Sequence, residues 1–312
     1  MSTPAGIPRA TVGRPPLAGA VPYGLFSAAT IGEGVDPHEL NGVEYETVCS
    51  TDVREWPPRC GTRTGSDDIT GYREKHAVET SSATRADPFA VYAAETCVLG
   101  NTQPDDLEQF RQRFQLGEPA AVEHVFHTGK LGNRPALAPD AVVLGNQTNP
   151  LPLARAIGLL EHWLACISGG TGVIHAPRWT AESLATSQLL GTRGPQAATK
   201  LGTTVAFATG YPGSAPAAAQ AEDTDKKTWL YATRPVTIRR STVTEPTEWG
   251  AGNVDLPHNV GFRMVERSYV IDVPCGQVAA VRTDLPLLDP NPPDPPPTEG
   301  QHTTSHIKEV RA

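Results

Sequence analysis

The 312-residue sequence lacks the features that mark several functional classes. Its five cysteines are an odd number with no CxxC pair, which argues against a zinc ribbon and favours a reduced intracellular protein. No apolar run approaches the about 20 residues that a membrane helix needs. The net charge is -8 and no basic stripe is evident, so coating of nucleic acid is not expected. Prolines and arginines stand where a signal peptide would have its apolar core, and we expect no secretion signal.

Glycine and proline are abundant instead, with 29 and 30 residues, while 38% of the chain is hydrophobic. This composition predicts a globular protein with long irregular arms, rich in strands and turns. The order of the predicted helices and strands makes the expected fold class α+β. Residues 1–22 are Pro-rich and predict an extended arm. The tail 289–312 begins with a polyproline-like run, continues with charged residues and cannot form a core.

Two helices are predicted from apolar spacing. The first covers 104–128, with Gly129 as C-terminal cap, and Gly117 and Pro119 predict a kink or restart inside it. Its apolar stripe is Leu107, Phe110, Phe114, Val122, Val125 and Phe126. The second covers 152–167 and is followed by a buried strand in "TGVIHAP" and a helix with Thr180 as N-cap.

Strands dominate elsewhere. From about residue 200 the chain alternates, most strictly in "FRMVERSYVIDVP". Residues 61–86 are polar and punctuated by Gly, Ser and Thr, which predicts two short strands paired as a protruding hairpin. Val43–Val48 is predicted as a separate strand before it.

His124 and His127, with Glu123 beside them, raise the question of a metal site. Zinc proteases space their histidines four apart around a glutamate, whereas the spacing here is three and the glutamate precedes both. We therefore interpret the pair as surface or interface histidines at a helix end, where a cationic ring would suit the helix dipole. Other residues weighed as a third ligand, without any link to the site, are His38, His162, His175 and Cys97.

No catalytic, cofactor-binding or metal-binding residue is predicted. Ser214 in "GYPGSAP" lacks the G-x-S-x-G pattern of a nucleophile elbow and indicates a turn. "ISGGTGVIH" runs from helix to strand, the reverse of a phosphate loop. Of Glu266 and Arg267, on opposite faces of a strand, one is expected in an ion-pair network and the other in solvent. The chain is therefore not expected to be an enzyme.

The order of elements resembles the major capsid proteins of tailed phages, the Hong Kong 97-type fold that encapsulins share. "EPAAVEHVFHTG" looks like the end of that family's spine helix. "LARAIGLLEHWLACISGGTGVIHAP" resembles the axial domain, and "LGTTVAFATGYPG" and "NVGFRMVERSYVIDVPCGQVAAV" resemble its re-entry and closing strands.

This resemblance implies a division of the chain. Residues 1–60 would form the N-terminal arm and first strand, and 61–90 an E-loop-like extended hairpin. Residues 91–150 would form the peripheral domain with the spine helix, 151–225 the axial-like helix-strand-helix, 226–288 the return strands, and 289–312 the Pro-rich tail.

The implied function is that of a major capsid subunit, which self-assembles through hexamers and pentamers into the head shell of a tailed phage. The phage would infect a GC-rich actinobacterial host. The shell would be built in the host cytoplasm and would enclose double-stranded DNA without reading its sequence. Scaffold, portal and decoration proteins are further candidate partners, and no membrane or cofactor is expected. The alternatives are an encapsulin-like nanocompartment shell and a soluble enzyme or minor virion protein.

Two covalent expectations accompany this interpretation. The thiols are expected to be mostly free, with a Cys49–Cys60 disulfide as the best exception. The resemblance also suggests a cross-link from Lys75, the lysine of the polar segment 61–86, to Asn253 or Asn259 of a neighbouring subunit. A solvated lysine is the simpler interpretation.

Overall fold

The computed structural model describes ten stretches of the chain. They are residues 21–34, 36–49, 53, 81–98, 106–146, 148–194, 196–222, 227–244, 254–255 and 260–287. Residues 1–20 of the expected arm 1–22 and the tail 289–312 lie outside them, as do Cys60, Lys75, Asn253 and Asn259. Within the described stretches, no helix has the length and apolarity to cross a bilayer.

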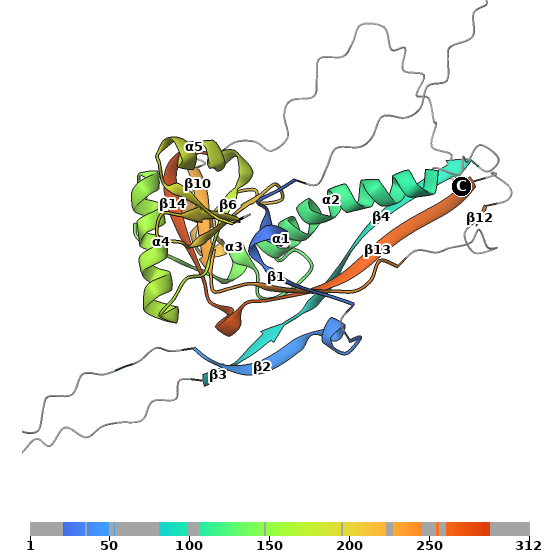
Figure 1. Cartoon of the computed structure of the whole chain (residues 1–312), viewed down its shortest axis with the longest axis horizontal. Helices are drawn as coiled ribbons and strands as arrows, with labels where there is room; N and C mark the ends of the chain where they lie inside the picture. Colours follow the sequence, from blue (N-terminus) through green and yellow to red (C-terminus); the bar gives the residue numbers. More distant parts are fainter. Residues whose placement is uncertain are drawn as a thin grey trace, which may run out of the picture.

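A seven-stranded sheet forms the more compact half of the molecule (Figure 1). Its order is β5 (Ala141–Val143), β14 (Val278–Pro286), β10 (Lys227–Thr233), β6 (Val173–Pro177), β9 (Thr204–Ala208), β8 (Gln196–Thr199) and β7 (Leu190–Arg193). The central strands are covered on both faces, which accounts for continuous apolar runs such as "VIHAP".

The central strand β10 shows how the two cores are separated. Trp229 and Tyr231 belong to one buried cluster, and Leu230 and Ala232 belong to the other. Because side chains alternate across a strand, this single strand contributes to both cores.

Helix α4 (Leu153–Ser168) covers the second face with the predicted stripe, and Gly169 ends it in a left-handed conformation. This element is confirmed. Helix α5 (Ala181–Thr186) follows β6 as expected, with Thr180 at its N-cap position as predicted. The Thr180 side chain makes no capping hydrogen bond, however, because the backbone there is helical and the hydroxyl donates to the Pro177 carbonyl (2.8 Å).

The other half of the molecule is an extended ribbon. β13 (Val260–Asp272) pairs antiparallel with β4 (Pro88–Val98) and, on its other side, with β11 (Thr237–Arg240) and β12 (Val254–Asp255). β1 (Thr30–Glu33) runs parallel to β11. Figure 1 shows α2 (Asp106–Thr128) lying along β4 and β13.

Helix α2 is one continuous element that contains Pro119, so the helix does not restart at Gly117 and Pro119. Phe114 before the proline and Val122 after it are buried in the same cluster, and this shared packing outweighs the hydrogen bond that proline removes. The predicted cap is confirmed, since Gly129 has φ 62° and its N–H donates to the Val125 carbonyl at 2.9 Å.

A separate two-stranded hairpin projects from the ribbon (Figure 1). β3 (Ser81–Ala86) pairs with β2 (Val43–Val48), and not with a strand inside 61–80 as predicted. The alternation in "VEYETV" predicts the separate strand Val43–Val48, but the sequence does not show which strand is its partner. We call the β2–β3 ladder the hairpin.

Short helical segments connect these layers. They are α1 (Leu25–Ala28), η1 (Glu39–Asn41), α3 (Leu137–Asp140), η2 (Arg178–Thr180), η3 (Ala217–Glu222) and η4 (Pro274–Gly276). Segment η4 is the link from β13 of the ribbon to β14 of the seven-stranded sheet.

The burial of α4 gives a direct test of the second core. Leu160 is 0% exposed, so Leu160→Ala should lower the free energy of unfolding by about 2–5 kcal/mol through the cavity it leaves. Leu201 is 76% exposed, and Leu201→Ala should change it by less than about 0.5 kcal/mol. Urea denaturation of both variants measures this, and equal losses would contradict the described core.

Candidate functional site

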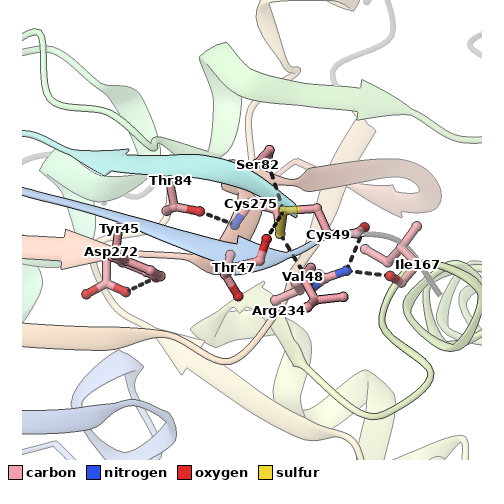
Figure 2. Close-up of a disulfide and its surroundings, with 10 residues drawn as sticks. All are labelled: Tyr45, Thr47, Val48, Cys49, Ser82, Thr84, Ile167, Arg234, Asp272 and Cys275. Carbon is pink, nitrogen blue, oxygen red and sulfur yellow. Dashed lines mark hydrogen bonds between the residues drawn. A yellow bond between two sulfur atoms is a disulfide. The ribbon is translucent and has the colours of Figure 1, made fainter. Parts of the chain in front are cut away.

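The hairpin is fastened to the body by a clamp of polar and covalent contacts (Figure 2). From β2, the Tyr45 hydroxyl donates to the buried carboxylate of Asp272 at 2.8 Å. Asp272 also accepts from Arg239, which reaches Glu39 of η1 at 3.1 Å. Burial, together with the Asp272 carboxylate, raises the pKa of Tyr45 above its ordinary value, so the phenol remains a donor.

Arg234 forms the second part of the clamp. Its guanidinium is buried and donates to the carbonyls of Val48 (3.0 Å) and Cys49 (3.1 Å), and to the Ile167 carbonyl in the last turn of α4. Burial lowers the pKa of Arg234, and the negative end of the α4 dipole favours the cation there. One side chain, from the residue directly after β10, thus joins the hairpin to α4.

A disulfide between Cys49 and Cys275 completes the clamp. Cys275 lies in η4 with a left-handed backbone (φ 65°), and its N–H donates to Thr84 Oγ1 of β3 at 2.7 Å. Both strands of the hairpin are therefore tied to the link between the two sheets. The predicted Cys49–Cys60 disulfide is wrong, because Cys49 bonds to Cys275 instead.

The sequence offered little warning of this pairing. The two cysteines are 226 residues apart, so only the folded topology brings them together. Cys166 is an exposed residue of α4, with its Sγ 3.6 Å from His162 Nε2.

Two buried glutamates anchor α2. Glu118 faces the ribbon and accepts from Arg267 at 2.7 Å and from the Tyr269 hydroxyl, with Arg240 3.9 Å away. Burial and the hydrogen bond to Glu118 raise the pKa of Tyr269. The sequence predicted that one of Glu266 and Arg267 takes part in an ion-pair network, and that residue is Arg267.

Glu123, the second anchor, faces the seven-stranded sheet. Its carboxylate is buried and accepts from the N–H of Leu25 (2.9 Å) and the N–H of Gly210 (3.0 Å). Burial raises the pKa of Glu123 above its usual range, and the backbone donors oppose that rise. Glu123 therefore joins α1, α2 and the turn after β9, and it is no candidate metal ligand.

The interpretation of His124 and His127 as surface or interface residues is wrong for His127, which is buried. It is 1% exposed, with its ring centroid 4.9 Å from that of Tyr231 and 5.6 Å from that of Tyr211. Among the described residues, neither ring nitrogen has a hydrogen-bond partner. Burial lowers the pKa of His127 to about 3, so the ring is neutral and the expected cationic histidine does not occur here. His124 is half-buried, and its pKa is also lowered by burial.

The other candidate ligands do not join this pair. His175 is buried between the hydroxyls of Tyr211 (2.9 Å) and Thr233 (2.8 Å), and burial lowers its pKa to about 3. His162 lies on α4 and His38 lies before η1. No group of three potential ligands occurs in the described stretches, which include the backbone of Cys97.

The turns that resembled catalytic motifs are structural where they are described. The Ser214 carbonyl accepts from the Tyr231 hydroxyl at 2.7 Å, which ties this turn to β10. "ISGGTG" links α4 to β6, the helix-to-strand connection that the sequence predicted.

Comparison with known proteins gives no match to a protein-family model and none to a curated protein. Solved structures do match. A chain from Mycobacterium phage Bobi is similar with a TM-score of 0.52 at 12% identity, over 89% of this chain and 96% of that one. A chain from Microbacterium phage Oxtober96 gives 0.50 at 14% identity, over 90% and 96%.

A third structure, the capsid of a native GTA particle computed with C5 symmetry, gives a TM-score of 0.50 at 10% identity, over 87% of this chain and 95% of that chain. The similarity therefore spans nearly the whole of each matched chain. At such identity it shows a shared fold, which is that of the GTA capsid chain and of the two phage chains, and the α+β fold predicted from the sequence is confirmed.

The buried histidines predict a pH dependence of stability. Their folded pKa of about 3 lies below the ordinary 6.5, so the stability is complete above pH 6.5 and falls as the pH drops towards 3, because the unfolded chain takes up the protons. Each of the two histidines should lower the free energy of unfolding by about 2 kcal/mol when the pH falls from 7 to 5. His127→Phe should remove its share, since His127 contacts aromatic rings.

The measurement is urea denaturation of the parent and of the Phe variant at pH 7 and pH 5. The loss of unfolding free energy between the two pH values is compared between the proteins, so that the contribution of the carboxylates, which is the same in both, cancels. The Phe variant should lose about 2 kcal/mol less than the parent. Equal losses would show that His127 is not buried as a neutral ring.

The close packing around Glu123 predicts that Gly210 cannot be replaced by a larger residue without loss of stability. A Cβ on Gly210 would collide with the Ala120 carbonyl and lie 2.7 Å from Glu123 Cβ. Gly210→Ala should therefore lower the unfolding free energy by several kcal/mol, above the about 1 kcal/mol of an average substitution. A Cβ at Gly117 of α2 meets nothing within 4 Å, and Gly117→Ala should be neutral or stabilising by up to about 1 kcal/mol. Thermal unfolding of both variants would reveal a reversed order.

Proposed function

We propose that the chain is a major capsid subunit, which self-assembles into the icosahedral head shell that encloses the genome of a tailed bacteriophage. The observation that carries the proposal is the similarity to the phage and GTA capsid structures over nearly their whole length. The fold alone does not dictate a function, so the surface of this chain must also suit assembly.

The exposed face of the ribbon supports this. Tyr92 of β4 is 68% exposed and Phe262 of β13 is 43% exposed. Both have even numbers on strands whose odd-numbered residues Val91 and Val265 are buried under α2, so they lie on the opposite face. Large apolar side chains on a long two-stranded surface favour contact with another protein molecule.

The segments can be assigned on this basis. We assign β2, β3 and the residues between them to an E-loop, which therefore begins at Val43 and not at residue 61. Helix α2 is the spine helix of a peripheral domain that includes β4 and β13. The unit of α4, β6 and α5 is the axial domain, completed by strands β10 and β14 from the later part of the chain. The N-terminal arm expected over residues 1–22 stays a prediction, because residues 1–20 lie outside the described stretches.

The proposed role is structural and not enzymatic. Three described groups with shifted pKa values, His127, His175 and Glu123, are buried in contacts that hold the fold together. We infer that the subunit's main partner is itself, in pentamers and hexamers, with scaffold, portal and decoration proteins as further partners. The shell would be assembled in the host cytoplasm and persist in the virion.

Electron microscopy of the purified full chain tests the proposal. Closed shells, or rings of five or six subunits, are expected. Dispersed monomers at high concentration under all conditions would overturn the capsid assignment. Shells purified with co-expressed protein instead of nucleic acid would favour a nanocompartment.

The E-loop assignment predicts a separation of folding from assembly. Replacing residues 50–80 by a short Gly-Ser linker keeps the hairpin and the clamp intact. The thermal transition should shift by only a few degrees, because the described residues of both buried cores come from other parts of the chain. Closed shells should be lost, and assembly should stop at small oligomers.

A linker of equal length to the replaced segment is the matched control, since it preserves reach but not side chains. Complete shells from either variant would contradict the E-loop assignment. An unfolded variant would place residues 50–80 in the folding core.

A further inference from the structure

The hairpin is joined to the molecule at two separate places. At one end the chain itself makes the connection, because Gly42 precedes β2 and Asp87 alone separates β3 from β4. At the other end of the ladder, where Val48 pairs with Ser81, the Cys49–Cys275 bond makes it (Figure 2). A six-residue strand spans roughly 20 Å, so the two attachments are well apart.

We propose that the Cys49–Cys275 pair is a redox lock on the hairpin. As a disulfide it holds the hairpin at two points, and a ladder held at two points cannot rotate about either one. As two thiols it leaves the hairpin attached covalently only at the Gly42–Asp87 end, about which it can pivot. The lock is a property of the subunit itself, and only its timing, described below, rests on the proposed capsid function.

Hydrogen bonds hold the two cysteines in place without the covalent bond. The Cys275 N–H donates to Thr84 Oγ1 at 2.7 Å, and Arg234 donates to the Cys49 carbonyl at 3.1 Å. The Tyr45–Asp272 contact aligns the same strand with the end of β13. These contacts place the sulfur atoms for bond formation, but they are reversible and can be exchanged for water.

The backbone at Cys275 gives independent support. Its φ of 65° and that of 57° at Gly276 are both left-handed. L-residues other than glycine are disfavoured in this region, so the backbone alone would favour glycine at position 275. The bond to Cys49 accounts for a cysteine at this position.

The chemistry requires an oxidant, for which we name a low-molecular-weight disulfide. One cysteine thiolate attacks it and releases one small thiol, and the second cysteine then displaces the other small thiol from the mixed disulfide. Two protein thiols are oxidised to one disulfide, and one small disulfide is reduced to two thiols. Both cysteines are half-buried, so a small reagent can reach them. In a capsid built in a reducing cytoplasm, the lock would close after release.

Hydrogen exchange of the purified full chain, in reduced or oxidised glutathione, tests the lock. In oxidised glutathione, a peptide linking Cys49 to Cys275 should appear, and amides of 43–49 and 81–86 should exchange at least about tenfold more slowly than in the reduced form. Amides of α4 should not change. Cys275→Gly, which relieves the left-handed backbone, and Cys49→Ser should show fast hairpin exchange in both conditions, with α4 still protected.

Each outcome decides the matter. Failure of the two cysteines to link, or equal hairpin exchange in both forms of the parent protein, would overturn the lock. Cys166→Ser is the control for thiol chemistry elsewhere, and a loss of the redox effect in that variant would also overturn it. Micrographs of the same samples report separately on assembly: shells without a redox effect would contradict the lock alone, and a redox effect without any shells would contradict the capsid function alone.

Discussion

The arrangement of the molecule depends on how α2 is held at its buried end. Glu123 places a carboxylate in the interior and gives it backbone donors from Leu25 and Gly210. Burying a carboxylate is costly unless it is hydrogen-bonded, so this position is stable only when α1 and the turn after β9 supply those donors. The lack of a side chain at Gly210 lets that turn approach the helix closely enough.

Glu118 repeats the device for the other half of the molecule. It lies five residues before Glu123 on the same helix, yet its partners Arg267 and Tyr269 belong to the ribbon. One helix thus carries two buried acids, one for each sheet, and sets the angle between the ribbon and the seven-stranded sheet. An acid on a helix can specify orientation more sharply than apolar contacts, because its hydrogen bonds have fixed directions.

The sequence predicted what periodicity encodes and missed what the topology decides. The extent of α4 and the termination of α2 at Gly129 follow from local spacing, and both were predicted. Strand β2 was found as a strand, but its pairing with β3 depends on the approach of distant segments. The burial of His127 was missed for a similar reason, because the rings of Tyr211 and Tyr231 come from a turn and a strand about a hundred residues later. A histidine within an apolar stripe that includes Phe126 was the available signal. The overall fold was accessible through the order of elements, which survives when individual motifs do not.

The position of η4 links these observations to assembly. This segment is the passage from β13 to β14, so it lies where the ribbon gives way to the seven-stranded sheet. The hairpin is fastened at that junction through Asp272 on its ribbon side and Cys275 within it, while Arg234 brings in α4. A change in the angle between the two sheets must therefore move the hairpin or break its clamp. Under the capsid proposal, neighbouring subunits contact the hairpin. An intact clamp would then limit how far the angle between the two sheets of one subunit can change while the hairpin keeps its contact with the next subunit.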